Sequence, residues 1–521
     1  MSAAALAGAL PEPATRVARD RAVTPRIVRG AELRGSRTVT VDACVVGSGA
    51  GGGPVAAGLA EAGLTVAVLE EGDLHGPETL TARPRDMTTG LYRDGGQLVT
   101  VGTPPIVLPL GRGIGGTTLV NSGTCFRTPA PVLARWRSEH GLEALTDDAA
   151  GALFRRVEEA IGVAQVTPEL AGENAAVVRR GAQALGVSGR HLFRNARGCV
   201  GSGVCAFGCP SGAKQHAGAV FAPRAWAAGA TTYTGCRAER LEVERGAVRG
   251  VQARTAAGGR LTVRARHVVV AAGALLTPLL LRANGIGTAS GALGRHLTIH
   301  PASAARALLD EPIDPWRGVP QSYFVDELAD DGILLEGIAG PPDQAAMATP
   351  GQGPEHRDRM LDVARTASFG VMVADTGEGR VLRLPTRPAR PLVRYDLHPT
   401  DAERLRRGFE LLARIFFAAG AREVLIPLSG VGVLRDGDVS PLQRARVRPR
   451  DVKAMAFHPL GTARAGADPR RSVCDPDLGV HGVRGLHVAD GSVVPSSPQV
   501  NPQLTIMALA TRLADHLAAE G

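Results

Sequence analysis

The hydrophobic pattern at the start of the chain predicts a strand, a helix and a second strand in close succession. Val39–Val46 alternates and then runs apolar, as a buried strand does. Gly47–Gly53 is a glycine-rich turn, and Pro54–Gly63 has a helical pattern with proline in its first turn, where a missing N–H does no harm. Leu64–Leu69 is a second apolar run. These residues therefore predict a βαβ unit, the opening of an α/β domain.

Helical and extended patterns alternate through the rest of the chain. Apolar residues at helical spacing predict helices over 129–140, 147–161, 172–185 and 400–419, and a last helix that begins near Pro502. Alternating residues predict strands over 231–243, 248–255 and 260–270. The stretch 311–358 is expected to be rich in loops.

The composition supports a large folded core and argues against several classes of protein. Of the 521 residues, 44% are hydrophobic and 21% are charged, which makes wholesale disorder a poor description. Aromatic residues make up only 3%, which argues against a stacking surface for single-stranded nucleic acid. No apolar run reaches the roughly 18–20 residues that a membrane-spanning helix needs. We therefore expect no nucleic-acid partner and no transmembrane segment.

The formal net charge of +9 is carried almost entirely by arginine, because Lys214 and Lys453 are the only lysines. The arginines are spread along the whole chain and form no dense basic block of the kind that binds nucleic acid. Two interpretations are open. One is an arginine-rich composition without a specific role, and the other is weak attraction to an anionic surface.

Residues 1–37 are expected to form a loose leader, since Met1–Pro11 is small and apolar but lacks the basic region and length of a signal peptide. The seven cysteines cannot all pair within one chain, and three of them, Cys199, Cys205 and Cys209, lie close together. This usage suits a reducing compartment better than a secreted disulfide framework, so we expect a cytoplasmic protein.

The strongest motif is the glycine turn after the first strand. Gly47, Gly49 and Gly52 fit the pattern G-x-G-x-x-G, whose glycines permit a tight turn, close approach of a pyrophosphate and tight helix–strand packing. Free N–H groups at the start of the next helix face the phosphates. Glu70 ends the second strand, where an acid binds a ribose hydroxyl. These features predict a dinucleotide site; a purely structural turn is the alternative.

Two later segments favour FAD as the dinucleotide. His267–Gly273 is a strand that ends in small residues. Gly485–Gly491 is another strand, and its final Asp490-Gly491 pair suits a position near a second phosphate or a ribityl chain. A dinucleotide site assembled from both ends of a chain is typical of flavoproteins.

In these motifs and in their order, the chain resembles the glucose–methanol–choline (GMC) oxidoreductases. The matching segments are Gly47–Gly52 with Glu70, Gly111–Thr118 with Asn121, Gly273–Pro278, Gly285–Gly287, His458–Thr462, Asp490–Gly491 and Asn501–Pro502. The resemblance implies an α/β fold in which a discontinuous, Rossmann-like FAD-binding domain joins an α+β substrate-binding domain built on an antiparallel sheet. We expect the FAD part over 38–300, the substrate part over 301–450, and a C-terminal part over 451–521 that returns to the FAD domain.

The resemblance also implies which positions bind FAD. They are Gly47, Gly49, Gly52, Glu70, Gly115, Gly116, Thr117, Asn121, Cys236, Gly273, Asp490, Gly491 and Pro502. Residues 115–121 would lie along the flavin, where small side chains let backbone N–H groups approach it. Some relatives attach the flavin covalently through His or Cys. Residues 111–127 contain no His, and Cys125 is interpreted as a buried structural thiol.

Several stretches most resemble the long-chain (fatty) alcohol oxidases within the family, namely Asn121–Pro129, Phe207–Gln215, Thr234–Glu239 and Leu297–Pro301. His458 is the candidate base, because a neutral imidazole can accept the hydroxyl proton of an alcohol while the hydride passes to flavin N5. Asn501 would hold the substrate oxygen through its amide. His300 also matches a family feature and is interpreted as structural.

Three interpretations of the cysteine loop are open. The spacing of Cys199, Cys205 and Cys209 resembles the iron–sulfur loop of bacterial FAD-dependent glucose dehydrogenases in the same family, which implies a [3Fe–4S] cluster. A zinc site that adds His216 is a second interpretation. The third is a set of buried thiols, or one disulfide, with a structural role.

The predicted enzyme therefore oxidises the CH–OH group of an aliphatic or lipid-like alcohol to an aldehyde or ketone, with FAD as cofactor. Its partners would be a small-molecule alcohol and either O2 or an external electron acceptor. The alternative is an iron–sulfur GMC dehydrogenase of a sugar or polyol that passes electrons to a partner protein. A non-redox flavin scaffold is disfavoured because both His458 and Asn501 are present. A nicotinamide-dependent dehydrogenase would fit the glycine turn alone.

Overall fold

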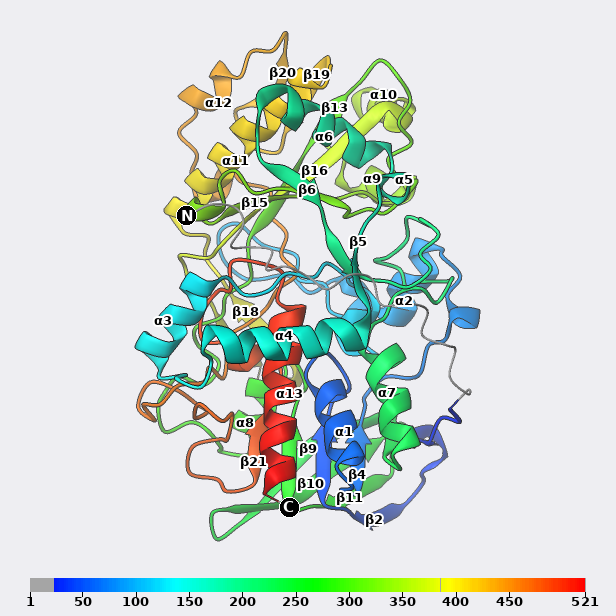
Figure 1. The fold of residues 1–521 in the computed structure, drawn as a ribbon, viewed down its shortest axis with the longest axis vertical. Helices are drawn as coiled ribbons and strands as arrows, with labels where there is room; N and C mark the ends of the chain where they lie inside the picture. The colour runs from blue at the N-terminus through cyan, green and yellow to red at the C-terminus, as the bar shows by residue number, and fades with distance from the viewer. Residues whose placement is uncertain (1–22, 385, 521) are drawn as a thin grey trace.

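The computed structural model describes residues 23–384 and 386–520, which form two parts stacked along the long axis of the molecule (Figure 1). The lower part in Figure 1 contains helices α1 (Gly52–Glu61), α7 (Ala217–Ala227) and α13 (Gln503–Ala519). The upper part contains α6 (Glu173–Leu185) and α11 (Pro399–Ala418). The predicted α/β domain joined to a second domain on an antiparallel sheet is confirmed.

A six-stranded parallel sheet forms the centre of the lower part. Its order is β1 (Ile27–Arg29), β8 (Thr231–Thr234), β4 (Val66–Leu69), β3 (Ala43–Val46), β12 (His267–Val270) and β21 (Leu486–Val488). Every residue of β3, β4 and β12 is buried, because strands covered on both faces carry continuous apolar runs. The sheet thus joins segments from the beginning, the middle and the end of the chain.

Beside this sheet lies a four-stranded sheet in the order β2 (Ser36–Thr40), β11 (Arg260–Arg264), β10 (Ala247–Thr255) and β9 (Cys236–Glu244). Each of the predicted strands 39–46, 231–243 and 260–270 is in fact two strands, one in each sheet, so these three predictions are wrong as single elements. The chain changes sheets within one or two residues, as at Gly235 between β8 and β9, where φ is +60°. So short a connection leaves no separate loop in the pattern.

The upper part is built on a seven-stranded antiparallel sheet. Its order is β20 (Gly432–Arg435), β19 (Glu423–Ile426), β13 (Ala302–Leu308), β16 (Thr366–Val373), β15 (Ile333–Gly337), β14 (Tyr323–Val325) and β6 (Gly189–His191). Helix α11 buries Leu405, Phe409 and Leu412 in the same core as Leu335 and Val371 of the sheet. One face of the sheet is therefore covered by α11.

The predicted helices agree closely with the structure. Helices α3 (Ala130–His140) and α4 (Asp147–Ile161) have the expected bounds to within one residue, and α4 crosses the middle of the molecule in Figure 1. Thr146 caps α4 by accepting a hydrogen bond from the N–H of Ala149, and Gly162 ends the helix in a left-handed conformation. The region 311–358, expected to be loop-rich, also contains β14, β15, α9 (Pro342–Ala348) and α10 (Pro354–Leu361).

The remaining elements are short or connect the two parts. They are α2 (Pro84–Leu91), α5 (Pro168–Ala171), α8 (Thr277–Ala283), α12 (Ser440–Arg444), β5 (Val163–Gln165), β7 (Phe193–Asn195), β17 (Arg380–Leu384) and β18 (Arg387–Arg394).

The segment predicted to be a loose leader contains ordered strands. Residues 1–22 lie outside the described residues, but β1 pairs with β8 and the start of β2 pairs with β11. The physical reason is that short extended stretches such as Ile27–Arg29 complete the edge of a sheet by backbone hydrogen bonds. The domain limits at residues 300 and 450 stay a prediction.

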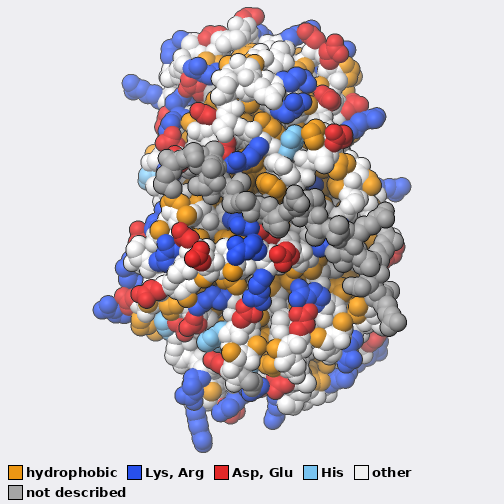
Figure 2. All heavy atoms as spheres, viewed as in Figure 1, with side chains coloured by type: hydrophobic (Ala, Val, Ile, Leu, Met, Phe, Trp, Pro, Cys, Tyr) orange, Lys and Arg blue, Asp and Glu red, His pale blue; other side chains and the backbone are white. Residues whose placement is uncertain are grey.

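The surface drawn in Figure 2 mixes Lys and Arg with Asp and Glu across the whole face, and the basic side chains do not gather in one patch there. Across residues 23–384 and 386–520, no helix combines the length and the apolar character that crossing a membrane requires.

Gly47→Ala is expected to destabilise the protein more than the matched substitution Gly63→Ala. Both glycines have similar left-handed backbones, with φ of +99° and +92°, where a side chain costs roughly 1–2 kcal/mol. A Cβ on Gly47 would also lie 2.3 Å from the carbonyl oxygen of Ala271, whereas nothing lies within 4 Å of one on Gly63. Urea unfolding should give the lower midpoint for Gly47→Ala. Equal midpoints would show that the contact with Ala271 does not constrain the turn.

Candidate functional site

A cavity of about 600 Å³ extends from the glycine turn after β3 to the sheet of the upper part. Most of the predicted site residues line it: Gly47, Gly49, Glu70, Gly116, Thr117, Asn121, Cys236, Gly273, His458, Asp490, Gly491, Asn501 and Pro502. Gly52 and Gly115 do not line it. Gly52 packs behind the turn, where an added Cβ would lie 1.9 Å from the carbonyl oxygen of Gly47. The backbone N–H of Gly115 donates to Ser48 Oγ at 3.2 Å.

Glu70 lies buried at the end of β4 and organises the turn. Its Oε2 accepts hydrogen bonds from the hydroxyl of Ser48 at 2.6 Å and from the Ser48 N–H at 3.2 Å. Its Oε1 accepts from the N–H of Gly72 at 2.8 Å. Burial raises the pKa of Glu70, although these hydrogen bonds partly offset the effect. The acid is therefore held in the position where this class of turn binds a ribose hydroxyl.

Asp490 performs a similar task beside the glycine turn, where a Cβ on Gly51 would lie 3.1 Å from the Cα of Asp490. Its Oδ2 accepts from the N–H of Gly273 at 2.8 Å and from the hydroxyl of Thr277 at 2.5 Å. Its Oδ1 accepts from the N–H of Ser492 at 2.8 Å. The carboxylate thereby ties the end of β21 to the end of β12. A Cβ on Gly273 would meet nothing within 4 Å, so this stretch of backbone faces open cavity.

Residues 115–121 form the third side of this region. Gly115 precedes a short 3-10 helix, Gly116–Leu119, which contributes Gly116 and Thr117 to the lining. The Asn121 amide donates to Gln503 Oε1 at 2.9 Å, which joins this segment to the start of α13. Cys236 donates its backbone N–H to the carbonyl of Glu70, and burial raises the pKa of its thiol to about 11. This thiol is therefore protonated near neutral pH.

The two candidate catalytic residues meet in the wall of the cavity. His458 Nε2 lies 3.5 Å from the amide nitrogen of Asn501, although 43 residues separate them. On the other side of the ring, His458 Nδ1 contacts His300 Nδ1 at 3.1 Å. Burial lowers the pKa of His458 to about 4, so its imidazole is neutral near pH 7 and one ring nitrogen can accept a proton. Asn501 Oδ1 is buried and has no hydrogen-bond partner among the described residues.

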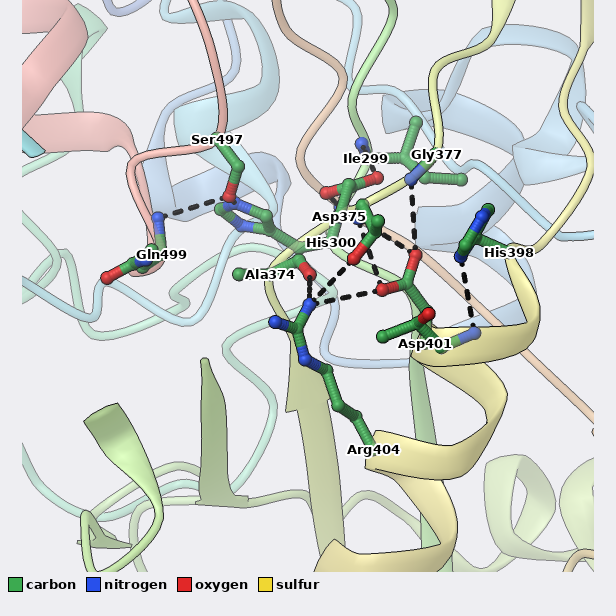
Figure 3. Close-up of polar contacts among 12 residues, drawn as sticks. Ile299, His300, Ala374, Asp375, Gly377, His398, Asp401, Arg404, Ser497 and Gln499 are labelled. Atoms are coloured by element: carbon green, nitrogen blue, oxygen red, sulfur yellow. Dashed lines mark hydrogen bonds and ion pairs between the residues drawn. The ribbon is translucent and has the colours of Figure 1, made fainter. Parts of the chain in front are cut away.

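His300 supports His458 directly, which the structural interpretation from sequence did not anticipate. His300 is 1% exposed, and its backbone has the unusual φ of +52°. Its Nε2 lies 2.7 Å from Ser497 Oγ, while its Nδ1 faces His458. The two ring contacts give His300 one hydrogen-bond partner on each side (Figure 3 shows the one with Ser497). A ring held at both nitrogens fixes the orientation of its neighbour.

A buried carboxylate fixes the backbone of His300 in turn. Asp375 accepts hydrogen bonds from the N–H groups of Ile299 and His300, both at 2.8 Å, and from the Tyr395 hydroxyl at 2.8 Å. Burial raises the pKa of Asp375 to about 7. Figure 3 shows the adjoining carboxylate of Asp401 in the first turn of α11, which accepts from two backbone N–H groups just beyond Asp375. These hydrogen bonds thus fix His300, and through it His458, to the upper part of the molecule.

Sequence reasoning missed Glu336, which lies on β15 and lines the cavity beside Asn501. Its Oε2 accepts from the Gln321 amide at 2.6 Å and from the Asn501 amide at 3.3 Å. Burial raises the pKa of Glu336 to about 7. The only sequence signal is one acid within the apolar stretch Ile333–Ile338.

The cysteine loop gives the metal hypotheses no support. Cys199, Cys205 and Cys209 are free thiols, and across residues 23–384 and 386–520 no group of three His, Cys, Asp or Glu side chains is arranged to hold a metal ion. The contacts of Cys205 come from positively charged groups, and those of Cys209 from the Ser211 hydroxyl and the Lys214 backbone N–H. Lys214 Nζ donates to the carbonyls of Cys205 and Asn121, both at 2.8 Å, and Arg194 Nη2 donates to Cys205 Sγ at 3.2 Å. The loop therefore braces Asn121 through a buried lysine.

Three features define a protein of the dinucleotide-binding class. They are the parallel sheet, the glycine turn with its buried acid, and the cavity that continues to a second sheet. Sequence comparison agrees. The family description "GMC oxidoreductase" matches residues 88–302 and 376–510. The chain is 44% identical over 482 residues to an uncharacterized GMC-type oxidoreductase of Mycobacterium tuberculosis, covering 92% of this chain and 76% of that protein. The chain belongs to the GMC oxidoreductase family, whose members are FAD-dependent oxidoreductases.

More distant relatives carry names that describe an activity. A long-chain-alcohol oxidase of Arabidopsis thaliana is 29% identical over 515 residues, covering 91% of this chain and 66% of that protein. Among solved structures, a formate oxidase of Aspergillus oryzae superposes with a TM-score of 0.71 at 18% identity, covering 92% of this chain and 98% of that one. This structural likeness concerns the fold alone.

Replacing His300 is expected to raise the pKa of His458. His300→Ala would remove the contact at Nδ1 and admit water beside a ring whose pKa burial holds near 4, so the pKa should move toward the ordinary value of about 6.5. The titration can be followed by NMR on protein with labelled histidines. Ser497→Ala, which keeps both rings, should produce a smaller change. An unaltered His458 pKa in His300→Ala would contradict the proposed dependence on this contact.

Proposed function

We propose that the protein is an FAD-dependent oxidoreductase that oxidises the CH–OH group of an alcohol to an aldehyde or ketone. The observation that carries this proposal is the contact between His458 Nε2 and the Asn501 amide in the wall of the cavity that begins at the dinucleotide turn. A neutral imidazole and an amide at one point can accept the hydroxyl proton and hold the alcohol oxygen. The long-chain-alcohol oxidase of Arabidopsis thaliana is consistent with this chemistry.

The residues present fit FAD. The open backbone at Gly273 and the glycine turn at Gly47 leave room for a dinucleotide, and Glu70 is positioned for its ribose. Glu70, Gly116, Asn121 and Asp490 would hold the cofactor together with these glycines. Bound FAD supplies the acceptor for the hydride of the carbinol carbon. An aliphatic or lipid-like substrate, and O2 or another external acceptor, remain our predictions for the partners.

In this proposal the protein handles the proton and the orientation. His458 Nε2 accepts the hydroxyl proton, and the His300 contact keeps the ring in place during the transfer. Asn501 holds the oxygen, so that the carbinol carbon keeps one orientation while its hydride leaves.

The test is an anaerobic absorbance titration of the purified protein, with FAD and iron quantified on the same sample. A long aliphatic alcohol, a sterol, glucose and choline serve as titrants. One FAD per chain, no iron and bleaching by an alcohol would support the proposal. About three irons per FAD would favour the iron–sulfur dehydrogenase. Absence of flavin that added FAD does not restore would refute the proposal.

His458→Ala is expected to slow flavin reduction by roughly 10²- to 10⁴-fold, because general-base assistance is worth that much. FAD content should be unchanged, since the glycine turn is untouched. His356→Ala, a substitution on α10 in the upper part, serves as the matched control and should reduce at the rate of the unmodified protein. The rate is measured by stopped-flow absorbance. Full activity in His458→Ala would remove the base assignment.

A further inference from the structure

Glu336 has an unused hydrogen-bonding position inside the cavity. Its side chain belongs to a residue only 5% exposed, and Oε1 has no hydrogen-bond partner among the described residues. Both bonds that the carboxylate receives, from Gln321 and from Asn501, go to Oε2. A buried acceptor without a partner is costly, and native structures retain one mainly where a ligand or water completes it.

The surroundings of Glu336 hold it toward the cavity. On β15, Leu335 belongs to the core under α11, whereas Leu334 and Glu336 face the opposite side. The residue that pairs with Glu336 on β16 is Gly370, which has no side chain to cover it. Phe324 flanks Glu336 on the other neighbouring strand, β14, so Glu336 is uncovered on the β16 side, where the cavity reaches it.

The orientation of the amide beside Glu336 is also determined. An ionised carboxylate only accepts, so the Gln321 amide nitrogen donates to Glu336 at 2.6 Å, and Gln321 Oε1 is left to accept from the Thr124 hydroxyl at 2.7 Å. The two neutral neighbours of the carboxylate, Gln321 and Asn501, therefore both donate to Oε2 and leave Oε1 without a donor. No positively charged side chain of the described residues contributes to the shift of the Glu336 pKa, which burial dominates.

The unused atom is close to the reacting group. Asn501 Nδ2 lies 3.5 Å from His458 Nε2 and 3.3 Å from Glu336 Oε2, so one amide spans the distance between base and carboxylate. A single small molecule can bridge the same distance if it carries two polar groups on adjacent or next-adjacent carbons. One group would be the hydroxyl that His458 deprotonates, and the other a donor for Oε1.

We propose that Glu336 is a substrate-binding residue that accepts a hydrogen bond from a second donor, a hydroxyl or an ammonium group, carried one or two carbons from the carbinol. This inference rests on the proposed alcohol oxidation. It assigns the substrate to the vicinal diols and amino alcohols at its reacting end, whatever apolar chain follows. An ammonium group would in addition neutralise the buried carboxylate.

The test compares three four-carbon probes in anaerobic flavin reduction by the holoenzyme: 1-butanol, 1,2-butanediol and 2-amino-1-butanol. The diol or the amino alcohol should reduce the flavin at least tenfold more efficiently than 1-butanol. Faster reduction by the diol identifies a hydroxyl donor, and faster reduction by the amino alcohol identifies an ammonium donor. Equal or better use of 1-butanol would overturn the inference while leaving alcohol oxidation intact.

Two variants separate charge from shape. Glu336→Gln keeps an acceptor oxygen without the charge, so it should lose at least tenfold of any preference for the amino alcohol and less of any preference for the diol. Glu336→Leu should lose both preferences, so that the three probes reduce the flavin with similar efficiency. Glu244→Gln, at an exposed strand end, is the control and should behave as the unmodified protein. Preferences that survive in Glu336→Leu would overturn the inference.

A binding measurement decides the inference if none of the three probes reduces the flavin. Calorimetric titration of the oxidised holoenzyme with 1,2-butanediol and with 2-amino-1-butanol should give weaker binding of at least one of them to Glu336→Leu than to the unmodified protein. Equal affinities for both would overturn the role of Glu336. Lack of reduction together with weaker binding to the variant would retain the binding site and locate the failure in the oxidation step.

Discussion

The whole site depends on a buried carboxylate, Asp490, being fully satisfied by hydrogen bonds from distant parts of the chain. A buried carboxylate is tolerated only where donors compensate its lost hydration. Here Gly273, Thr277 and Ser492 supply them. Because two of these donors lie more than 200 residues earlier, the bond fixes the last strand against the middle of the chain. The loops that carry His458 and Asn501 lie next to this strand end and line the same cavity.

Local features of the sequence were predicted well because their causes are local. Helix α4 has the predicted bounds, since Thr146 caps its start and Gly162 ends it. The glycine turn lies between strand and helix as expected. Strand predictions failed where the chain crosses from one sheet to another within one or two residues, because so short a connection leaves no separate loop in the pattern. Strand partners depend on the whole fold, which a local pattern does not contain.

The candidate site was predicted only in part for the same reason. His458 and Asn501 carry recognisable motifs, and the structure brings them together. The contact of His300 with His458 joins residues 158 positions apart, and the family feature at His300 gave no sign of it. Glu336 lies within an apolar strand, where a single acid is easily taken for an edge or surface position. The three cysteines had left a metal site and a structural role both open, and no group of three His, Cys, Asp or Glu side chains in the described part of the chain is arranged to hold a metal ion.

The antiparallel sheet separates two kinds of evolutionary change. On β15, Leu335 packs under α11 whereas Glu336 lines the cavity, so a substitution at Glu336 alters the cavity without disturbing the helix on the other face of the sheet. None of these positions belongs to the glycine turn or to the strands that follow it. In a family with this arrangement, a few positions on the cavity face of one sheet can change which substrate is bound. The glycine turn and its strands, which belong to the dinucleotide site, can stay the same.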